Sequence, residues 1–131
     1  MQSLNQRFDN TEIPEQELMF SGHVACSGCG ASLSMRLALK GLGKPTALVI
    51  PACCWAIIPG PWPGTALDVP MFQTAFETTG AVISGLKAAY RKRGMEDVCV
   101  VGWAGDGGTY DIGIQALSGA AERNEDVVYV C

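Results

Sequence analysis

The sequence predicts an α/β fold in which a parallel sheet carries helices on both faces. Three apolar stretches of strand length, residues 46–50, 97–101 and 126–131, alternate with segments of helical periodicity. These strands are continuously apolar, so each must be covered on both faces, as parallel sheets with crossover helices are. At 131 residues the chain has the length of one such domain.

Three helices are predicted from apolar residues at helical spacing, over residues 31–42, 78–93 and 111–123. Gly43 stops the first helix and Gly94 ends the second, as glycines commonly do. One helix therefore precedes each predicted strand, which is the alternation that a parallel sheet requires.

The remaining segments are predicted to be irregular. Residues 1–20 are polar and are interpreted as an extended arm, which leaves residues 21–131 as the domain. Residues 51–70 contain five prolines, so we expect a long ordered loop of the kind that usually serves function. The last strand runs to Cys131, and an apolar strand with nothing after it would be an exposed edge. We therefore expect a domain truncated at its C-terminus.

Composition excludes several classes of protein. Nine Lys and Arg against thirteen Asp and Glu give a net charge of −4 without a basic stripe, which argues against nucleic-acid binding. No apolar run reaches the roughly 20 residues that a membrane helix needs. Charged residues near the N-terminus exclude a signal peptide, so a cytoplasmic protein is expected. Six cysteines in a reducing compartment favour metal binding or redox chemistry over disulfides.

A glycine-rich loop, Gly105-Asp106-Gly107-Gly108, joins the second strand to the last helix. Free amides at a helix N-terminus bind anions such as phosphate. A dinucleotide fingerprint fails at its sixth position, Tyr110, and no P-loop is present. Asp106 would repel a pyrophosphate unless a divalent cation lay between them, and Mg²⁺ fits that requirement. The alternative is a plain turn whose aspartate caps the helix.

The cysteines form a second candidate site. Cys26 and Cys29 make a C-x-x-C pair, and Cys54 follows after 24 intervening residues. Such spacing suits one metal centre, with His23 or Cys53 as the fourth ligand if the metal is zinc. Spacing alone does not distinguish zinc from an iron–sulfur cluster, and a thioredoxin-like redox pair is disfavoured because no strand precedes the motif. The single histidine is otherwise expected to make a loop hydrogen bond.

Three segments carry a resemblance to a known family: GHVACSGCG (22–30), DVPMFQTAFETTGAVISGL (68–86) and AGDGGTYDIGIQALSGAAER (104–123). Over residues 17–131 the chain resembles the thiamine-diphosphate-binding β subunit of 2-oxoacid:ferredoxin oxidoreductases, of which the pyruvate enzyme is the best-known member. The resemblance implies the thiamine-diphosphate-binding fold.

The resemblance also implies roles for individual residues. Cys26, Cys29 and Cys54 match three ligands of a [4Fe–4S] cluster, and Asp106 matches a Mg²⁺ ligand. The residues expected at the cofactor are Gly105, Gly107, Gly108, Thr109 and Cys53. A fourth cluster cysteine and a Mg²⁺-binding asparagine are expected after Cys131. The glutamate that activates the cofactor is expected on a partner subunit, so this chain needs no catalytic side chain of its own.

The implied activity is oxidative decarboxylation of a 2-oxoacid, with electrons passing through the cluster to ferredoxin. Implied partners are an α-type pyrimidine-binding subunit, γ and ferredoxin-like δ subunits, and coenzyme A if the enzyme is of the pyruvate type. Ala52 and Ala56 replace a threonine and a glutamate of many relatives, which raises oxalate or another 2-oxoacid as substrate beside pyruvate. Two alternatives are a non-catalytic zinc-binding interaction module and a thiamine enzyme without a cluster; the three cysteines argue against the latter.

Overall fold

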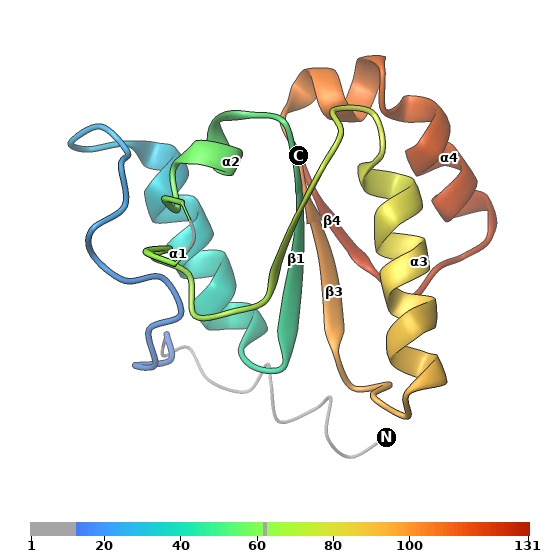
Figure 1. The fold of residues 1–131 in the computed structure, drawn as a ribbon, viewed down its shortest axis with the longest axis horizontal. Coiled ribbons are helices and arrows are strands. Elements are labelled where there is room, and N and C mark those ends of the chain that lie inside the picture. The colour runs from blue at the N-terminus through green and yellow to red at the C-terminus, as the bar shows by residue number, and fades with distance from the viewer. Residues whose placement is uncertain (1–12, 62) are drawn as a thin grey trace.

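A computed structural model describes residues 13–61 and 63–131. A central sheet separates helix α1 from helices α3 and α4 (Figure 1). Of the expected N-terminal arm, residues 1–12 lie outside the described residues. No helix in the described ranges is both long and apolar enough to cross a membrane.

The sheet has four strands, in the order β2-β1-β3-β4, and all three neighbouring pairs are parallel. The predicted parallel sheet is therefore confirmed. The strands are β1 (Thr46–Pro51), β2 (Met71–Thr74), β3 (Cys99–Trp103) and β4 (Val128–Val130). The prediction of three strands was wrong, because β2 also joins the sheet beside β1.

Strand β2 escaped the sequence analysis for a physical reason. It is an edge strand of four residues that directly follows Pro70, and its middle residues Phe72 and Gln73 are exposed. A strand that buries so little has no continuous apolar run to reveal it. Strand β3 also lies two residues later than predicted, because Gly102 and Trp103 pair with β4.

The predicted helices on both faces of the sheet are confirmed by the two hydrophobic clusters. In β1, Leu48 and Ile50 point into a cluster that includes residues of α1 (Gly30–Leu42), whereas Ala47 and Val49 point into one built on α3 (Thr79–Lys92). All four side chains are at most 1% exposed. This alternation is why the strand had to be apolar at every position.

Helix α4 (Ile114–Glu122) packs against α3 through a glycine. A Cβ at Gly80 would lie 2.5 Å from the backbone of Ala116 and Leu117. No side chain fits there, so glycine sets the distance between the two helices on this face of the sheet.

A buried lysine fastens α3 to the amino end of the sheet. The Lys87 ammonium donates to the carbonyl oxygens of Glu96 and Val98, each at 3.0 Å, and forms an ion pair with Asp126 at 3.0 Å. All three donor positions of the ammonium are thereby used, which is what a buried lysine requires. The Lys87 ammonium lowers the pKa of the Asp126 carboxyl from its usual value.

The proline-rich segment 51–70 contains a short helix, α2 (Cys54–Ile57), so the prediction that this segment holds no helix was wrong. The prolines lie outside these four residues. Trp55 and Ile58 are buried in the cluster on the α1 face. Leu67 forms an antiparallel bridge with Met19, which ties the end of the segment to the N-terminal strap, residues 13–20.

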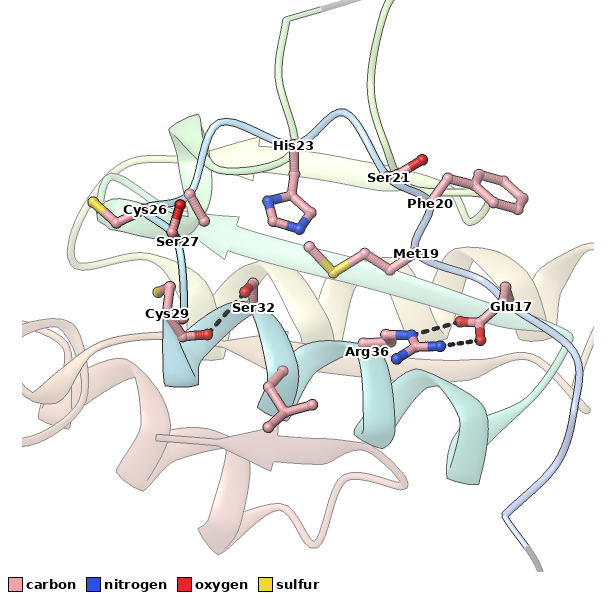
Figure 2. Close-up of a pocket in the computed structure, with 13 residues that line it drawn as sticks. Glu17, Met19, Phe20, Ser21, His23, Cys26, Ser27, Cys29, Ser32 and Arg36 are labelled. Atoms are coloured by element: carbon pink, nitrogen blue, oxygen red, sulfur yellow. Dashed lines mark hydrogen bonds and ion pairs between the residues drawn. The ribbon is translucent and has the colours of Figure 1, made fainter.

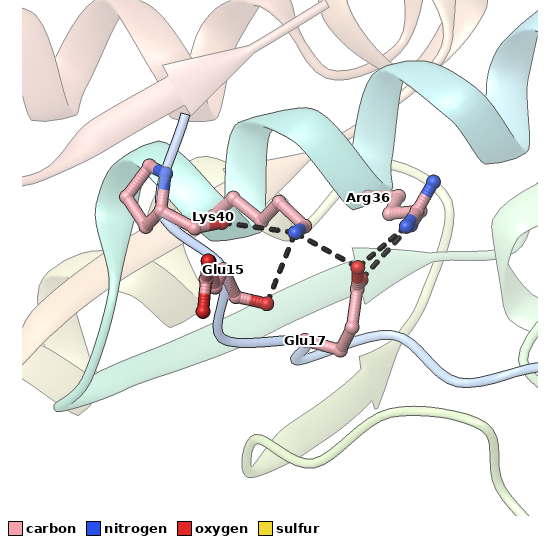
Figure 3. A network of polar contacts seen from close by, with 5 residues as sticks. Glu15, Glu17, Arg36 and Lys40 are labelled. Atoms are coloured by element: carbon pink, nitrogen blue, oxygen red, sulfur yellow. Dashed lines mark hydrogen bonds and ion pairs between the residues drawn. The ribbon is translucent and has the colours of Figure 1, made fainter. Parts of the chain in front are cut away.

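Charged side chains hold this strap against α1 (Figure 3). Glu17 pairs with the Arg36 guanidinium through two hydrogen bonds and with the Lys40 ammonium at 2.8 Å. Lys40 also donates to the carbonyl oxygens of Pro14 and Glu15. Hydrogen bonds from Arg36, and then from Lys40, lower the pKa of Glu17 to about 2.

Candidate cofactor-binding site

The strand order places a topological switch point between β1 and β3. The chain leaves the carboxyl end of β1 toward α2 on the α1 face, and it leaves β3 toward the helices on the opposite face (Figure 1). In open α/β sheets, ligands bind at the carboxyl ends of the strands where successive connections diverge in this way. Cys53 and Asp106 follow these two strands, so both lie at this edge.

The glycine-rich loop of the sequence is a π-helical turn, η2 (Gly107–Asp111), which begins directly after Asp106. The predicted helix start at residue 111 was therefore wrong, since helical backbone begins earlier and α4 continues it from Ile114. Single π-turns are rare and occur frequently at functional sites. The side chain of Asp106 is exposed at the start of this turn.

Glycines are required in this turn because backbone and an aromatic ring approach them closely. A Cβ at Gly113 would lie 1.7 Å from the carbonyl oxygen of Gly108. A Cβ at Gly107 would lie 3.0 Å from the ring of Phe76, and one at Gly108 would lie 3.2 Å from the carbonyl oxygen of Phe76. The loop that follows β2 therefore covers one side of the turn.

Thr109 braces the turn from inside. Its side chain is 2% exposed, and its hydroxyl donates to the carbonyl oxygen of Gly105 at 2.6 Å. The hydroxyl therefore already has a partner in the protein. Its predicted place at the cofactor stays a prediction.

A tryptophan pair connects α2, which follows β1, with the last residue of β3. The rings of Trp55 and Trp103 meet edge to face, with centroids 5.5 Å apart and an interplanar angle of 75°. Both are buried, and such pairs contribute about 0.5–1.5 kcal/mol beyond the burial of their area. Because Trp55 follows Cys54 and Trp103 lies shortly before Asp106, the pair holds the two candidate loops next to each other.

Cys26 and Cys29 lie on a different feature, a cavity of about 810 Å³ between the strap and the start of α1 (Figure 2). The Cys26 side chain is exposed and that of Cys29 is half-buried, and Ser32 donates to the Cys29 carbonyl oxygen at 2.9 Å. Cys54 begins α2 with an exposed side chain and does not line this cavity.

The structure does not bring the predicted metal ligands together. Within residues 13–61 and 63–131, no three His, Cys, Asp or Glu side chains converge on a point where they would hold a metal ion. His23 lines the same cavity as Cys26 and Cys29, but its Nδ1 is buried without a hydrogen-bond partner in the described part of the chain. The expected loop hydrogen bond of the histidine is therefore not made by that nitrogen.

The turn at Asp106, in contrast, fits a Mg²⁺-bound diphosphate. Mg²⁺ takes one or two protein carboxylates and completes its coordination with phosphate oxygens and water. The exposed Asp106 carboxylate supplies such a ligand, and the first amides of a helical turn have no intrahelical acceptor. One carboxylate beside free amides, at a switch point, is therefore a suitable donor set for this group.

Sequence reasoning missed Phe76 and the contact between Trp55 and Trp103. Phe76 lies within the segment 68–86 that carries the family resemblance, but nothing in its spacing indicates that its ring covers a glycine turn. The two tryptophans lie 48 positions apart (103 minus 55), and only the pairing of β1 with β3 brings their loops together.

The comparison with known families assigns this domain to a class of thiamine-dependent enzymes. Residues 57–131 match the family described as "Thiamine pyrophosphate enzyme, C-terminal TPP binding domain", and the chain belongs to that family. It is 60% identical over 123 residues to ketoisovalerate oxidoreductase subunit VorB of Pyrococcus furiosus, covering 90% of this chain and 40% of that protein.

Similar matches extend to pyruvate synthase. The chain is 50% identical over 120 residues to pyruvate synthase subunit PorB of Methanothermobacter thermautotrophicus, covering 92% of this chain and 42% of that protein. The resemblance to β subunits of 2-oxoacid:ferredoxin oxidoreductases is thereby confirmed. The chain spans about 40% of the length of the curated relatives that it matches.

Proposed function

We propose that this chain is the diphosphate-binding part of the β subunit of a 2-oxoacid:ferredoxin oxidoreductase, in which residues 21–131 form the binding domain and residues 1–20 an arm. The observation that carries the proposal is the placement of Asp106, an exposed carboxylate at the start of a π-turn on the switch point of the sheet. The proposal extends to a cytoplasmic complex with further subunits and a ferredoxin, and with coenzyme A if pyruvate is the substrate.

Each residue at the turn then has a defined task. Asp106 holds Mg²⁺, and the amides of Gly107 and Gly108 bind the diphosphate whose charge the Mg²⁺ offsets. Gly105 and Thr109 shape the turn through their mutual hydrogen bond. Thiamine diphosphate, when bound, supplies the electron sink for decarboxylation of a 2-oxoacid. Cys53, on the neighbouring strand end, is proposed to lie beside the cofactor.

Binding of Mg²⁺ and thiamine diphosphate to the intact complex tests this proposal. The complex is stripped with EDTA and titrated with thiamine diphosphate at fixed Mg²⁺, using tryptophan fluorescence or calorimetry. Asp106→Asn is expected to weaken Mg²⁺-dependent binding by roughly 100-fold, because removing a charged partner of a bound ion costs about 3 kcal/mol. Asp111→Asn, an exposed aspartate at the far end of the same turn, is the matched control and should bind normally. Equal binding by both variants would refute the assignment.

For the substrate, the names of the relatives favour a branched-chain 2-oxoacid. Ketoisovalerate oxidoreductase subunits match at 60% and 58% identity, whereas the pyruvate synthase subunit matches at 50%. Of the residues that prompted the expectation of oxalate, Ala52 lies just before Cys54 and Ala56 lies in α2. The test is kcat/KM of the whole complex for ketoisovalerate, pyruvate and oxalate with a ferredoxin acceptor. A higher kcat/KM for ketoisovalerate supports a branched-chain substrate. A higher kcat/KM for pyruvate or oxalate overturns it.

A [4Fe–4S] cluster on Cys26, Cys29 and Cys54 is the second part of the proposal. The C-x-x-C spacing and the family membership support it. The described cysteines themselves do not converge on one point. Anaerobic analysis of iron and acid-labile sulfide in the complex tests it. Iron with sulfide, lost together in Cys26→Ser, supports the cluster, whereas zinc without sulfide supports the alternative, a zinc-binding interaction module.

A further inference from the structure

Tyr129, which no motif assigns, reaches from the last strand to the underside of the π-turn. It pairs with Gly102 in the register of β3 and β4, and a Cβ at Gly102 would lie 3.0 Å from the Tyr129 ring. The ring therefore packs closely over Gly102, where a side chain would be crowded. Its hydroxyl lies 3.4 Å from Oγ1 of Thr109 and 3.5 Å from the carbonyl oxygen of Gly108.

The direction of these hydrogen bonds follows from counting protons. The single hydroxyl hydrogen of Thr109 is donated to the Gly105 carbonyl oxygen at 2.6 Å, so Thr109 can only accept from Tyr129. The carbonyl oxygen of Gly108 can only accept as well. Tyr129 has a single hydroxyl hydrogen for these two acceptors. Donated to the Gly108 carbonyl oxygen, it engages the group that follows the Asp106-Gly107 step, while the Thr109 hydroxyl engages the Gly105 carbonyl oxygen that precedes it.

The carbonyl groups of Gly105 and Gly108, on either side of the Asp106-Gly107 step, are therefore both held from the protein side. Thr109 is 2% exposed and Tyr129 is half-buried against the cluster on the α3 face, whereas the side chain of Asp106 is exposed. Single π-turns of this kind are rare and are frequent at functional sites. With the carbonyl groups tied inward, the turn presents the carboxylate of Asp106 and its first amides outward.

We propose that Tyr129 is a positioning residue for Mg²⁺ and thiamine diphosphate, acting through Thr109 and Gly108 on the geometry of the turn. This inference rests on the proposed function, because it assumes that the turn held by Thr109 and Tyr129 binds that cofactor. It predicts that the phenol hydroxyl affects cofactor binding without touching the cofactor.

The test uses the intact complex with Tyr129→Phe, which keeps the ring over Gly102 and removes only the hydroxyl. Binding of Mg²⁺ and thiamine diphosphate is expected to weaken roughly 3- to 10-fold, the loss of about one hydrogen bond. Tyr90→Phe is the matched control, because Tyr90 packs against the same cluster from the last turns of α3, away from the π-turn.

A second readout works on the stripped protein and separates this inference from the proposed function. Amide hydrogen exchange of residues 107–110 should be several-fold faster in Tyr129→Phe than in the wild type or in Tyr90→Phe. Faster exchange with weaker binding supports the inference. Unchanged exchange, or exchange that rises without any change in binding, overturns it. A wild-type complex that binds no thiamine diphosphate refutes the proposed function. The hydrogen bonds of Thr109 and Tyr129 would then have no role in binding that cofactor.

Discussion

The π-turn after β3 and the cysteine segments assigned to the cluster differ in how completely the chain holds them. The π-turn after β3 is tied by Thr109 and Tyr129 and covered by Phe76. The thiols assigned to the cluster, in contrast, are exposed or half-buried and lie apart, on the cavity and on α2. A site that binds a dissociable cofactor gains from being formed beforehand, because less ordering is left for the binding step. A site for thiolate-bound metal is commonly completed by the metal itself.

The largest effect is expected at Gly113. In Gly113→Ala the added Cβ would lie 1.7 Å from the Gly108 carbonyl oxygen, so the π-turn must rearrange. We expect a loss of about 3 kcal/mol or more in the free energy of unfolding, or failure to fold, measured by urea denaturation. Gly85→Ala, in an open position of α3, is the control and should stabilise by about 0.5–1 kcal/mol. Equal stability of the two variants would show that the turn is not rigidly packed.

A second large effect is expected at Lys87, which fastens the helix beneath the π-turn. Lys87→Met leaves the carbonyl groups of Glu96 and Val98 without their donor, so the free energy of unfolding should fall by about 1–3 kcal/mol. Lys92→Met, an exposed lysine at the end of the same helix, should change it by less than about 0.5 kcal/mol. A loss confined to Lys87→Met in urea denaturation is the expected result, and similar curves for both would contradict it.

A smaller effect on folding is expected at Cys26, in the segment 21–29 before α1, called the cysteine loop here. Cys26→Ser in the metal-free complex should change the free energy of unfolding by less than about 0.5 kcal/mol, because the side chain is exposed. The same substitution should lower the iron bound per complex relative to the wild type, measured by metal analysis after reconstitution. A large loss of stability without metal would mean that the cysteine loop is as firmly built as the π-turn, and the contrast between the two regions would be lost.

The sequence predicted the parts of this molecule that depend on burial and on short motifs. Strand β1 could be predicted because every residue in it is buried. The glycine turn could be predicted because its motif consists of four consecutive residues, 105–108. Strand β2 was invisible because Phe72 and Gln73 are exposed at an edge. The contact between Tyr129 and Thr109, which lie 20 positions apart, depends on the register between β3 and β4. Register is fixed by the whole sheet, so no local pattern carries it.

The smallest effect is expected at Glu17, in the strap. The pH dependence of its contribution to the unfolding free energy distinguishes the strap from the π-turn. The carboxyl has a pKa of about 2 in the folded protein, below the usual value of 4.5, because Arg36 and Lys40 hydrogen-bond to the charged form. A lowered pKa stabilises the folded state above the unfolded pKa, so this contribution is full above about pH 4.5 and is lost as pH falls toward 2.

The difference in unfolding free energy between wild type and Glu17→Gln should therefore shrink across that range. Because 31% of the Glu17 side chain is exposed, solvent screens the pair and the difference should be small at every pH. Glu15→Gln is the control, since it keeps the backbone carbonyl that Lys40 contacts, and its difference from wild type should not follow this course. A Glu17→Gln difference that stays the same as the pH falls would mean that the strap is held by packing of Leu18 and Met19 alone, and that its charged contacts contribute nothing to folding.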